Sequence, residues 1–202
     1  MRPAEEALIV VDMQNDFCPG GALAVAGGDQ IVPLINALMD DFAAVILTQD
    51  WHPWDHTSFA ETHPGSQPFT QIDMAYGKQT LWPRHCVQGS PGAEFHPGLR
   101  CDPAQLIVRK GFRRDIDSYS AFFENDRTTS TGLIGYLASR GISSVVLVGL
   151  ATDYCVAYSA LDAARHGLGV TVLEHACRAI DLGGSLAIQR SAMRAADIKL
   201  LL

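Results

Sequence analysis

The 202-residue sequence contains no long apolar run and no cluster of Lys or Arg. Its longest apolar stretch, residues 145–151, is far shorter than the ~18 residues of a membrane helix, which argues against a membrane span or anchor. Fifteen Lys and Arg stand against 22 Asp and Glu, a formal net charge of −7, so nucleic acid and anionic membrane surfaces are poor partners. The acidic N-terminus and the brief run at residues 7–11 lack the pattern of a signal peptide, and we expect a cytoplasmic protein.

Paired cysteines and several catalytic motifs are also missing. The five cysteines are odd in number, widely spaced and without a CxxC pair, which favours unpaired thiols in a reducing compartment: Cys18, Cys86, Cys101, Cys155 and Cys177. Neither GxSxG nor HExxH occurs, which excludes the serine-hydrolase and zincin patterns. The GxG at residues 167–169 precedes a predicted strand instead of following one, so we expect no nucleotide cofactor.

What the sequence does contain is an alternation of strand and helix patterns. Six short runs rich in Val, Ile and Leu predict parallel strands buried on both faces, at residues 8–11, 45–47, 106–108, 145–148, 170–173 and 198–202. Apolar spacings of three and four predict helices at residues 29–40, 129–140, 153–166 and 184–196, two of them stopped by Gly141 and Gly167. We therefore expect an α/β fold, a three-layer α/β/α sandwich with a mostly parallel central sheet. Residues 1–202 form one domain in this prediction, with a small metal-binding lobe at about residues 51–100, which are rich in Pro, Gly, His and Trp.

Chemically active residues stand at the predicted strand ends. The first three predicted strands lead directly into Asp12, Asp50 and Lys110. The strand at residues 145–148 leads into a helix that carries Cys155 in its first turn. Because open parallel sheets bind ligands beyond the carboxyl ends of their strands, we expect these four side chains to meet at one edge.

Cys155 is the candidate nucleophile of this group. A helix N-terminus favours the thiolate over the thiol and offers N–H groups to an oxyanion. A carboxylate at Asp12 can accept the thiol proton and return it to a leaving amine, while Lys110 holds that carboxylate. A buried inert cysteine beside a structural ion pair is the alternative.

Histidines concentrate in the same part of the chain. Five of the seven lie within residues 52–96. In an extended segment Asp50 and His52 point to one side, and His85 can return as a third ligand with open positions for water or substrate. This set suits Zn²⁺, Fe²⁺ or Mn²⁺ without choosing among them. Histidines of a surface loop are the alternative.

Seven motifs follow one another along nearly the whole chain: VDMQNDFCPGGAL at 11–23, QDWHP at 49–53, WPRHCV at 82–87, GAEF at 92–95, KG at 110–111, DSYSAF at 117–122 and GLATDYCV at 149–156. In content and order they resemble the nicotinamidases of the isochorismatase-like cysteine hydrolase superfamily. The resemblance implies the isochorismatase-like hydrolase fold.

The resemblance also implies roles for individual residues. The implied catalytic triad is Asp12, Lys110 and Cys155, and the implied metal ligands are Asp50, His52 and His85. A cis peptide between Leu150 and Ala151 would turn the Ala151 N–H toward an oxyanion hole shared with the N–H of Cys155. Phe17, Trp82 and Tyr119 match residues that line the substrate pocket. Water or a residue among Ser58, Glu61, His56 and His63 would complete the metal shell, and residues 64–81 match no part of the family pattern.

The implied activity is hydrolysis of nicotinamide to nicotinate and ammonia through a cysteine thioester, in NAD salvage, with pyrazinamide as a further substrate. One divalent transition metal is expected, Zn²⁺ first, with Fe²⁺ and Mn²⁺ as alternatives. Two other functions stay open: an amidase of the same superfamily acting on a carbamoyl or ureido compound, and a non-catalytic metal- or ligand-binding module. The sequence also leaves open whether the chain forms a homo-oligomer.

Overall fold

A parallel sheet organises the computed structural model, which describes residues 3–202. Within these residues six strands form one sheet in the order β5-β2-β1-β6-β7-β8, with parallel neighbours throughout, and two more form an antiparallel hairpin. The strands are β1 (Glu6–Val11), β2 (Ala44–Asp50), β3 (Gln71–Met74), β4 (Gly77–Thr80), β5 (Leu106–Lys110), β6 (Ser144–Leu150), β7 (Gly169–Arg178) and β8 (Lys199–Leu201). The helices are α1 (Val32–Met39), α2 (Leu133–Ser139), α3 (Ala157–Arg165) and α4 (Ser185–Ala195).

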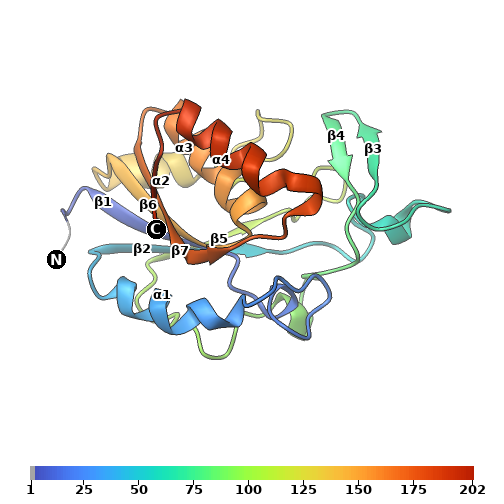
Figure 1. Cartoon of the computed structure of the whole chain (residues 1–202), viewed down its shortest axis with the longest axis horizontal. Coiled ribbons are helices and arrows are strands. Elements are labelled where there is room, and N and C mark those ends of the chain that lie inside the picture. The colour runs from blue at the N-terminus through green and yellow to red at the C-terminus, as the bar shows by residue number, and fades with distance from the viewer. Residues whose placement is uncertain (1–2) are drawn as a thin grey trace.

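The elements stack in three layers. Helix α1 covers one face of the sheet, and α3 and α4 cover the other (Figure 1). The expected α/β/α sandwich with a parallel central sheet is therefore confirmed. No helix in residues 3–202 is long and apolar enough to cross a membrane.

The predicted strands agree with the observed ones, but their burial does not agree everywhere. Strands β1, β2 and β6 are buried almost throughout, as apolar runs in the middle of a sheet should be. The prediction of burial on both faces is wrong for β5 and β8, which lie at the two edges of the sheet. Ile107 on β5 is 46% exposed and Leu201 on β8 is 47% exposed. An apolar run does not itself say whether a strand has neighbours on both sides.

The predicted helices exist but begin differently. The stretch 29–40 opens with a 3₁₀ turn (Asp29–Ile31) before α1, and 153–166 opens with a π-helical turn (Thr152–Val156) before α3. The stretch 129–140 becomes helical only from Leu133, because Asp126 accepts hydrogen bonds from the backbone and hydroxyl of Thr129 and holds that segment in a turn. Helix α4 agrees with the prediction to within a residue at each end.

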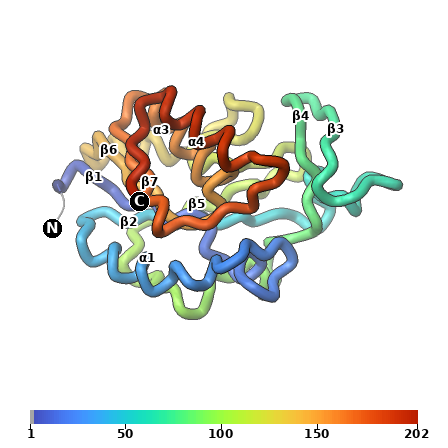
Figure 2. Tube along the Cα trace, in the orientation of Figure 1, coloured from blue at the N-terminus to red at the C-terminus, as the bar shows by residue number. Residues whose placement is uncertain are grey.

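The β3–β4 hairpin lies in residues 64–81, the segment that matched no part of the family pattern. Gln71 pairs with Thr80 and Met74 with Gly77 in an antiparallel register. The hairpin stands apart from the main sheet, beyond the carboxyl edge of its strands (Figure 2). Each strand has only four residues, and although β3 (QIDM) alternates polar and apolar side chains, β4 (GKQT) does not, so the pattern was too short to predict the hairpin. That residues 51–100 act as a metal-binding lobe of a single domain stays a prediction.

A close approach between β1 and β6 yields a prediction about stability. Gly149 on β6 has φ +112°, and a Cβ built there would lie 2.2 Å from the backbone oxygen of Val11 on β1. Gly149→Ala should therefore lower the free energy of unfolding by at least about 2 kcal/mol, measured by urea denaturation. Gly135→Ala in α2 is the matched control, because nothing lies within 4 Å of a Cβ there. Equal unfolding free energies for the two variants would contradict this account.

Candidate active site

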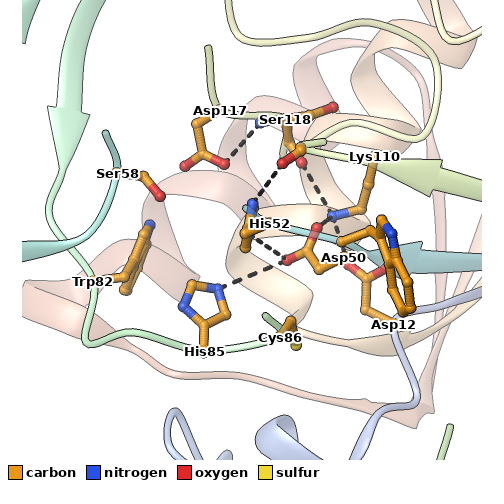
Figure 3. Close-up of polar contacts among 12 residues, drawn as sticks. Asp12, Asp50, His52, Ser58, Trp82, His85, Cys86, Lys110, Asp117 and Ser118 are labelled. Atoms are coloured by element: carbon orange, nitrogen blue, oxygen red, sulfur yellow. Dashed lines mark hydrogen bonds and ion pairs between the residues drawn. The ribbon is translucent and has the colours of Figure 1, made fainter. Parts of the chain in front are cut away.

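Four chain segments deliver charged or nucleophilic groups to the carboxyl edge of the sheet. Lys110, the last residue of β5, lies opposite Asp50 in the β2–β5 register. Its Nζ lies 2.7 Å from Asp12 Oδ2 and is also paired with Asp50 Oδ1 (Figure 3). The same Nζ lies 3.4 Å from Cys155 Sγ. The ammonium additionally donates to the carbonyl of Ser118 at 3.0 Å. The expected meeting of Asp12, Asp50, Lys110 and Cys155 is confirmed.

Asp12 and Cys155 lie side by side in the buried site. A carboxylate oxygen of Asp12, one of Asp50 and the sulfur of Cys155 all lie within 4.8 Å of one another, and all three residues are buried. Thr48 completes this arrangement and was not predicted: its hydroxyl donates to Asp12 Oδ1 at 2.6 Å and accepts from the Asp12 N–H at 3.1 Å. The position of Thr48, two residues before the end of β2, was the signal that could have revealed it.

Burial decides the protonation of the site. It raises the pKa of Asp12 to about 6, against the opposing effect of Lys110. Burial also raises the pKa of the Cys155 thiol well above its usual value, although Lys110 acts in the other direction. The expectation that a helix N-terminus favours the thiolate is therefore wrong for the resting site, because Cys155 is buried in the π-helical turn that precedes α3. The thiol is neutral and needs a base.

The two carboxylates keep Lys110 charged. Burial opposes the ammonium, but Asp12 and Asp50 raise the pKa of Lys110 well above its usual value. Burial likewise opposes ionisation of Asp50, yet Lys110 and then His52 hold the pKa of that carboxyl well below its usual range. One ammonium between two acids leaves a net negative field when both are ionised, which favours an additional cation.

The residues expected to bind metal converge on Asp50. His52 Nε2 lies 3.6 Å and His85 Nε2 lies 3.9 Å from Asp50 Oδ2 (Figure 3). His52 Nδ1 donates to the carbonyl of Gly111 and His85 Nδ1 to that of Pro83, both at 2.8 Å. A carbonyl only accepts, so each ring carries a proton on Nδ1 and turns its Nε2 toward Asp50. Although burial opposes the charged ring, Asp50 raises the pKa of His52, so His52 Nε2 binds a metal only after it gives up its own proton. This buried set fits a divalent transition metal.

The residues considered for the remaining metal positions are placed differently. Glu61 accepts from the Arg84 N–H at 3.2 Å, and His63 Nε2 is bonded to the carbonyl of Thr57 at 2.8 Å. Within residues 3–202, neither belongs to a cluster that could hold a metal ion. His56 lies nearer, with its ring centroid 4.4 Å from that of His52 and its Nδ1 2.7 Å from Ser58 Oγ.

A small pocket opens onto the thiol. Its walls include the three expected rings, Phe17, Trp82 and Tyr119, together with residues that were not predicted, notably Asp117, Tyr154 and Ile180. Cys155, His85 and Asp50 also reach this pocket. The signal for Tyr154 was its place beside Cys155 in the motif GLATDYCV. The cis peptide expected between Leu150 and Ala151 is present, and Ala151 lines the same pocket.

A parallel sheet with a buried thiol, carboxylate and ammonium at its carboxyl edge defines an α/β protein with the isochorismatase-like hydrolase fold. The sequence profile of the Isochorismatase domain matches residues 6–197, and the chain belongs to the isochorismatase family.

Several proteins of known name or structure are similar to this chain. A nicotinamidase of Acinetobacter baylyi is 61% identical over 180 residues, which cover 89% of this chain and 84% of the relative. The structure of an Acinetobacter baumanii nicotinamidase and pyrazinamidase is 55% identical with a TM-score of 0.98, covering 100% of this chain and 97% of that one. The structure of a Pyrococcus horikoshii pyrazinamidase in complex with zinc is 39% identical with a TM-score of 0.79, covering 98% of each chain.

The histidine geometry predicts which residue is needed for metal binding. His85→Ala removes a directed Nε2 lone pair and should weaken Zn²⁺ binding at least about a hundredfold, measured by competition with a chromogenic chelator. His63→Ala is the matched control and should bind like the unaltered protein, because His63 is bonded to Thr57. Equal weakening by both substitutions would show that the ligands have been misassigned.

Proposed function

We propose that this protein is a metal-dependent cysteine amidohydrolase that converts nicotinamide to nicotinate and ammonia. The observation that carries the proposal is the buried Cys155 thiol, within reach of the Asp12 carboxylate and open to an aromatic pocket. The 61% identity to a nicotinamidase over 89% of the chain supports the choice of substrate. Pyrazinamide, a similar ring carboxamide, is proposed as a second substrate.

The proposed reaction begins with a proton transfer. Asp12 accepts the thiol proton of Cys155 as the sulfur bonds to the amide carbon, and the carbonyl oxygen takes up the electron pair. Lys110 keeps Asp12 ionised beforehand and stabilises the negative charge nearby. The backbone N–H groups of Ala151 and Cys155 are the proposed donors to the oxyanion.

Collapse of the tetrahedral intermediate breaks the carbon–nitrogen bond. Asp12 returns its proton to the nitrogen, ammonia leaves, and a thioester remains on Cys155. Asp12, ionised again, then takes a proton from water as the water oxygen attacks the thioester carbon. The carbon–sulfur bond breaks, Asp12 passes the proton taken from water to the sulfur, and the product leaves as nicotinate after its remaining acid proton is lost to solvent.

The pocket walls position the ring for this chemistry. Phe17, Trp82 and Tyr119 would hold the pyridine ring so that its carboxamide faces the sulfur. Such positioning lowers the barrier because it removes rotational freedom before the reaction.

Asp50, His52 and His85 would hold the metal. A metal held by these residues would supply a Lewis-acid site for the pyridine nitrogen of the substrate. Zn²⁺ is the proposed ion, supported by the donor set and by the zinc complex of the Pyrococcus relative, with Fe²⁺ and Mn²⁺ as alternatives. A role in NAD salvage in the cytoplasm belongs to the same proposal.

Ammonia release from nicotinamide tests the proposal directly. The unaltered protein should release ammonia, and treatment with a chelator should stop the release. Cys155→Ala should lower kcat by at least about a thousandfold while the protein stays folded and keeps its metal. Cys101→Ala, at a half-buried cysteine outside the pocket, should retain full turnover. Appreciable turnover by Cys155→Ala would refute the nucleophile assignment.

The ionisation of Asp12 predicts the pH dependence. Because Asp12 acts as a base and its pKa is raised to about 6, kcat/KM should fall as the pH drops below about 6. The hydrogen bond from Thr48 lowers the pKa of Asp12, so Thr48→Val should move this acid limb to higher pH. Thr171→Val, in strand β7, should leave the limb in place. A limb that does not move in Thr48→Val would argue against Asp12 as the titrating base.

A further inference from the structure

Gln79 is a polar side chain that the mechanism does not use. It lies on β4, in the hairpin that the sequence analysis did not predict, and its side chain is fully buried. The residues just before it, Gly77 and Lys78, are exposed. A buried amide on a two-stranded hairpin that stands apart from the main sheet needs hydrogen-bond partners from other parts of the chain.

Two of those partners, Asp117 and Tyr119, belong to the wall of the substrate pocket. Gln79 Nε2 donates to Asp117 Oδ2 at 2.7 Å and to Tyr119 Oη at 3.0 Å, and it also lies 2.7 Å from the carbonyl of Thr80. Gln79 Oε1 accepts from Asn125 Nδ2 at 3.2 Å and from Tyr76 Oη at 3.1 Å. We call the contacts of Gln79 with Asp117, Tyr119 and Asn125 the Gln79 bridge.

The Tyr119 hydroxyl links the Gln79 bridge to the aromatic rings. Tyr119 Oη accepts a second hydrogen bond, from Trp82 Nε1 at 3.0 Å. Trp82 packs edge-on against Tyr119 and against Tyr154, with ring centroids 6.2 Å and 4.8 Å apart. All three rings line the pocket beside Cys155. The position of the Tyr119 hydroxyl oxygen therefore helps to fix the positions of the aromatic rings that form this wall of the pocket.

The loop that carries Asp117 and Tyr119 is held by the same network. Asn125 Oδ1 accepts from the Tyr119 N–H at 3.0 Å, and the Asn125 N–H donates to the Asp117 carbonyl at 2.8 Å. Gln79 bonds to both ends of this arrangement, through Asn125 and through Asp117. The side chain of Gln79 thus connects the hairpin to the wall of the pocket.

We propose that Gln79 is a positioning residue that sets the affinity of the pocket for a planar ring carboxamide by holding the Tyr119 hydroxyl, and through it Trp82. This inference rests on the proposed function. The side-chain hydrogen bonds described for Gln79 go to the pocket wall and to the hairpin, whereas the proton transfer runs between Asp12 and Cys155. Loss of the Gln79 bridge therefore acts on KM, and kcat stays within about twofold.

A double-mutant cycle tests the inference. Gln79→Met keeps the side-chain length without its amide, and Tyr119→Phe removes the hydroxyl. Each should raise KM for nicotinamide about fivefold, because each removes the hydrogen bond that Gln79 and Tyr119 share and that holds the ring-binding wall. The double variant should stay within about twofold of the larger single effect, whereas independent effects would multiply to about twenty-five-fold. Gln71→Met, at an exposed position of strand β3 in the same hairpin, is the matched control and should keep its KM.

The outcomes separate the inference from the proposed function. Ammonia release by the unaltered enzyme tests the function, and the ratios among variants test the Gln79 bridge. Titration of the same proteins with nicotinate measures those ratios without turnover. An unchanged KM in folded Gln79→Met, or effects that multiply in the double variant, would overturn the inference. If Gln79→Met does not fold, Tyr119→Phe decides alone, because an unchanged KM there means that the hydroxyl does not set the affinity.

Discussion

The ammonium of Lys110, buried between two carboxylates and a thiol, is the interaction on which the site depends. Burying a lysine is costly unless its charge is matched, and here Asp12 and Asp50 match it from the carboxyl ends of the adjacent strands β1 and β2. The two carboxylates that contact this ammonium have different roles. Asp12, deeper in the interior, keeps a pKa near 6 and suits a base, while Asp50 stays ionised and faces the imidazoles.

Burial has opposite consequences for the thiol and for its surroundings. It keeps Cys155 protonated at rest, so the sulfur becomes nucleophilic only when Asp12 takes the proton. The dry environment that suppresses the thiolate also strengthens every charge interaction around it. The histidines are also oriented by distant groups, because the backbone carbonyls of Gly111 and Pro83 accept from Nδ1 and turn Nε2 of each ring toward Asp50. Reactivity thus comes from the arrangement of the groups and not from a permanently activated side chain.

Much of the fold could be predicted because its signals are local. Apolar runs located the six strands of the main sheet, and strand ends placed Asp12, Asp50 and Lys110 at one edge. The exposure of Ile107 and the hairpin at residues 71–80 could not be predicted. The first depends on which strand has a neighbour, and the second on polar strands held by contacts such as those of Gln79. The hydrogen bond from Thr48 to Asp12 could not be predicted for a similar reason, since a threonine in a strand gives the same sequence pattern whether or not a carboxylate lies beside it.

The order of residues along the chain determined the alternation of strands and helices, the residue types at the strand ends and the motifs that mark the family, because these depend on neighbours in sequence. Only the tertiary structure decided the protonation of Cys155, the direction of the imidazole Nε2 atoms and the joining of the hairpin to the aromatic pocket. Each of these depends on which distant groups surround a side chain and how far they exclude water, and desolvation is a property of the packed molecule.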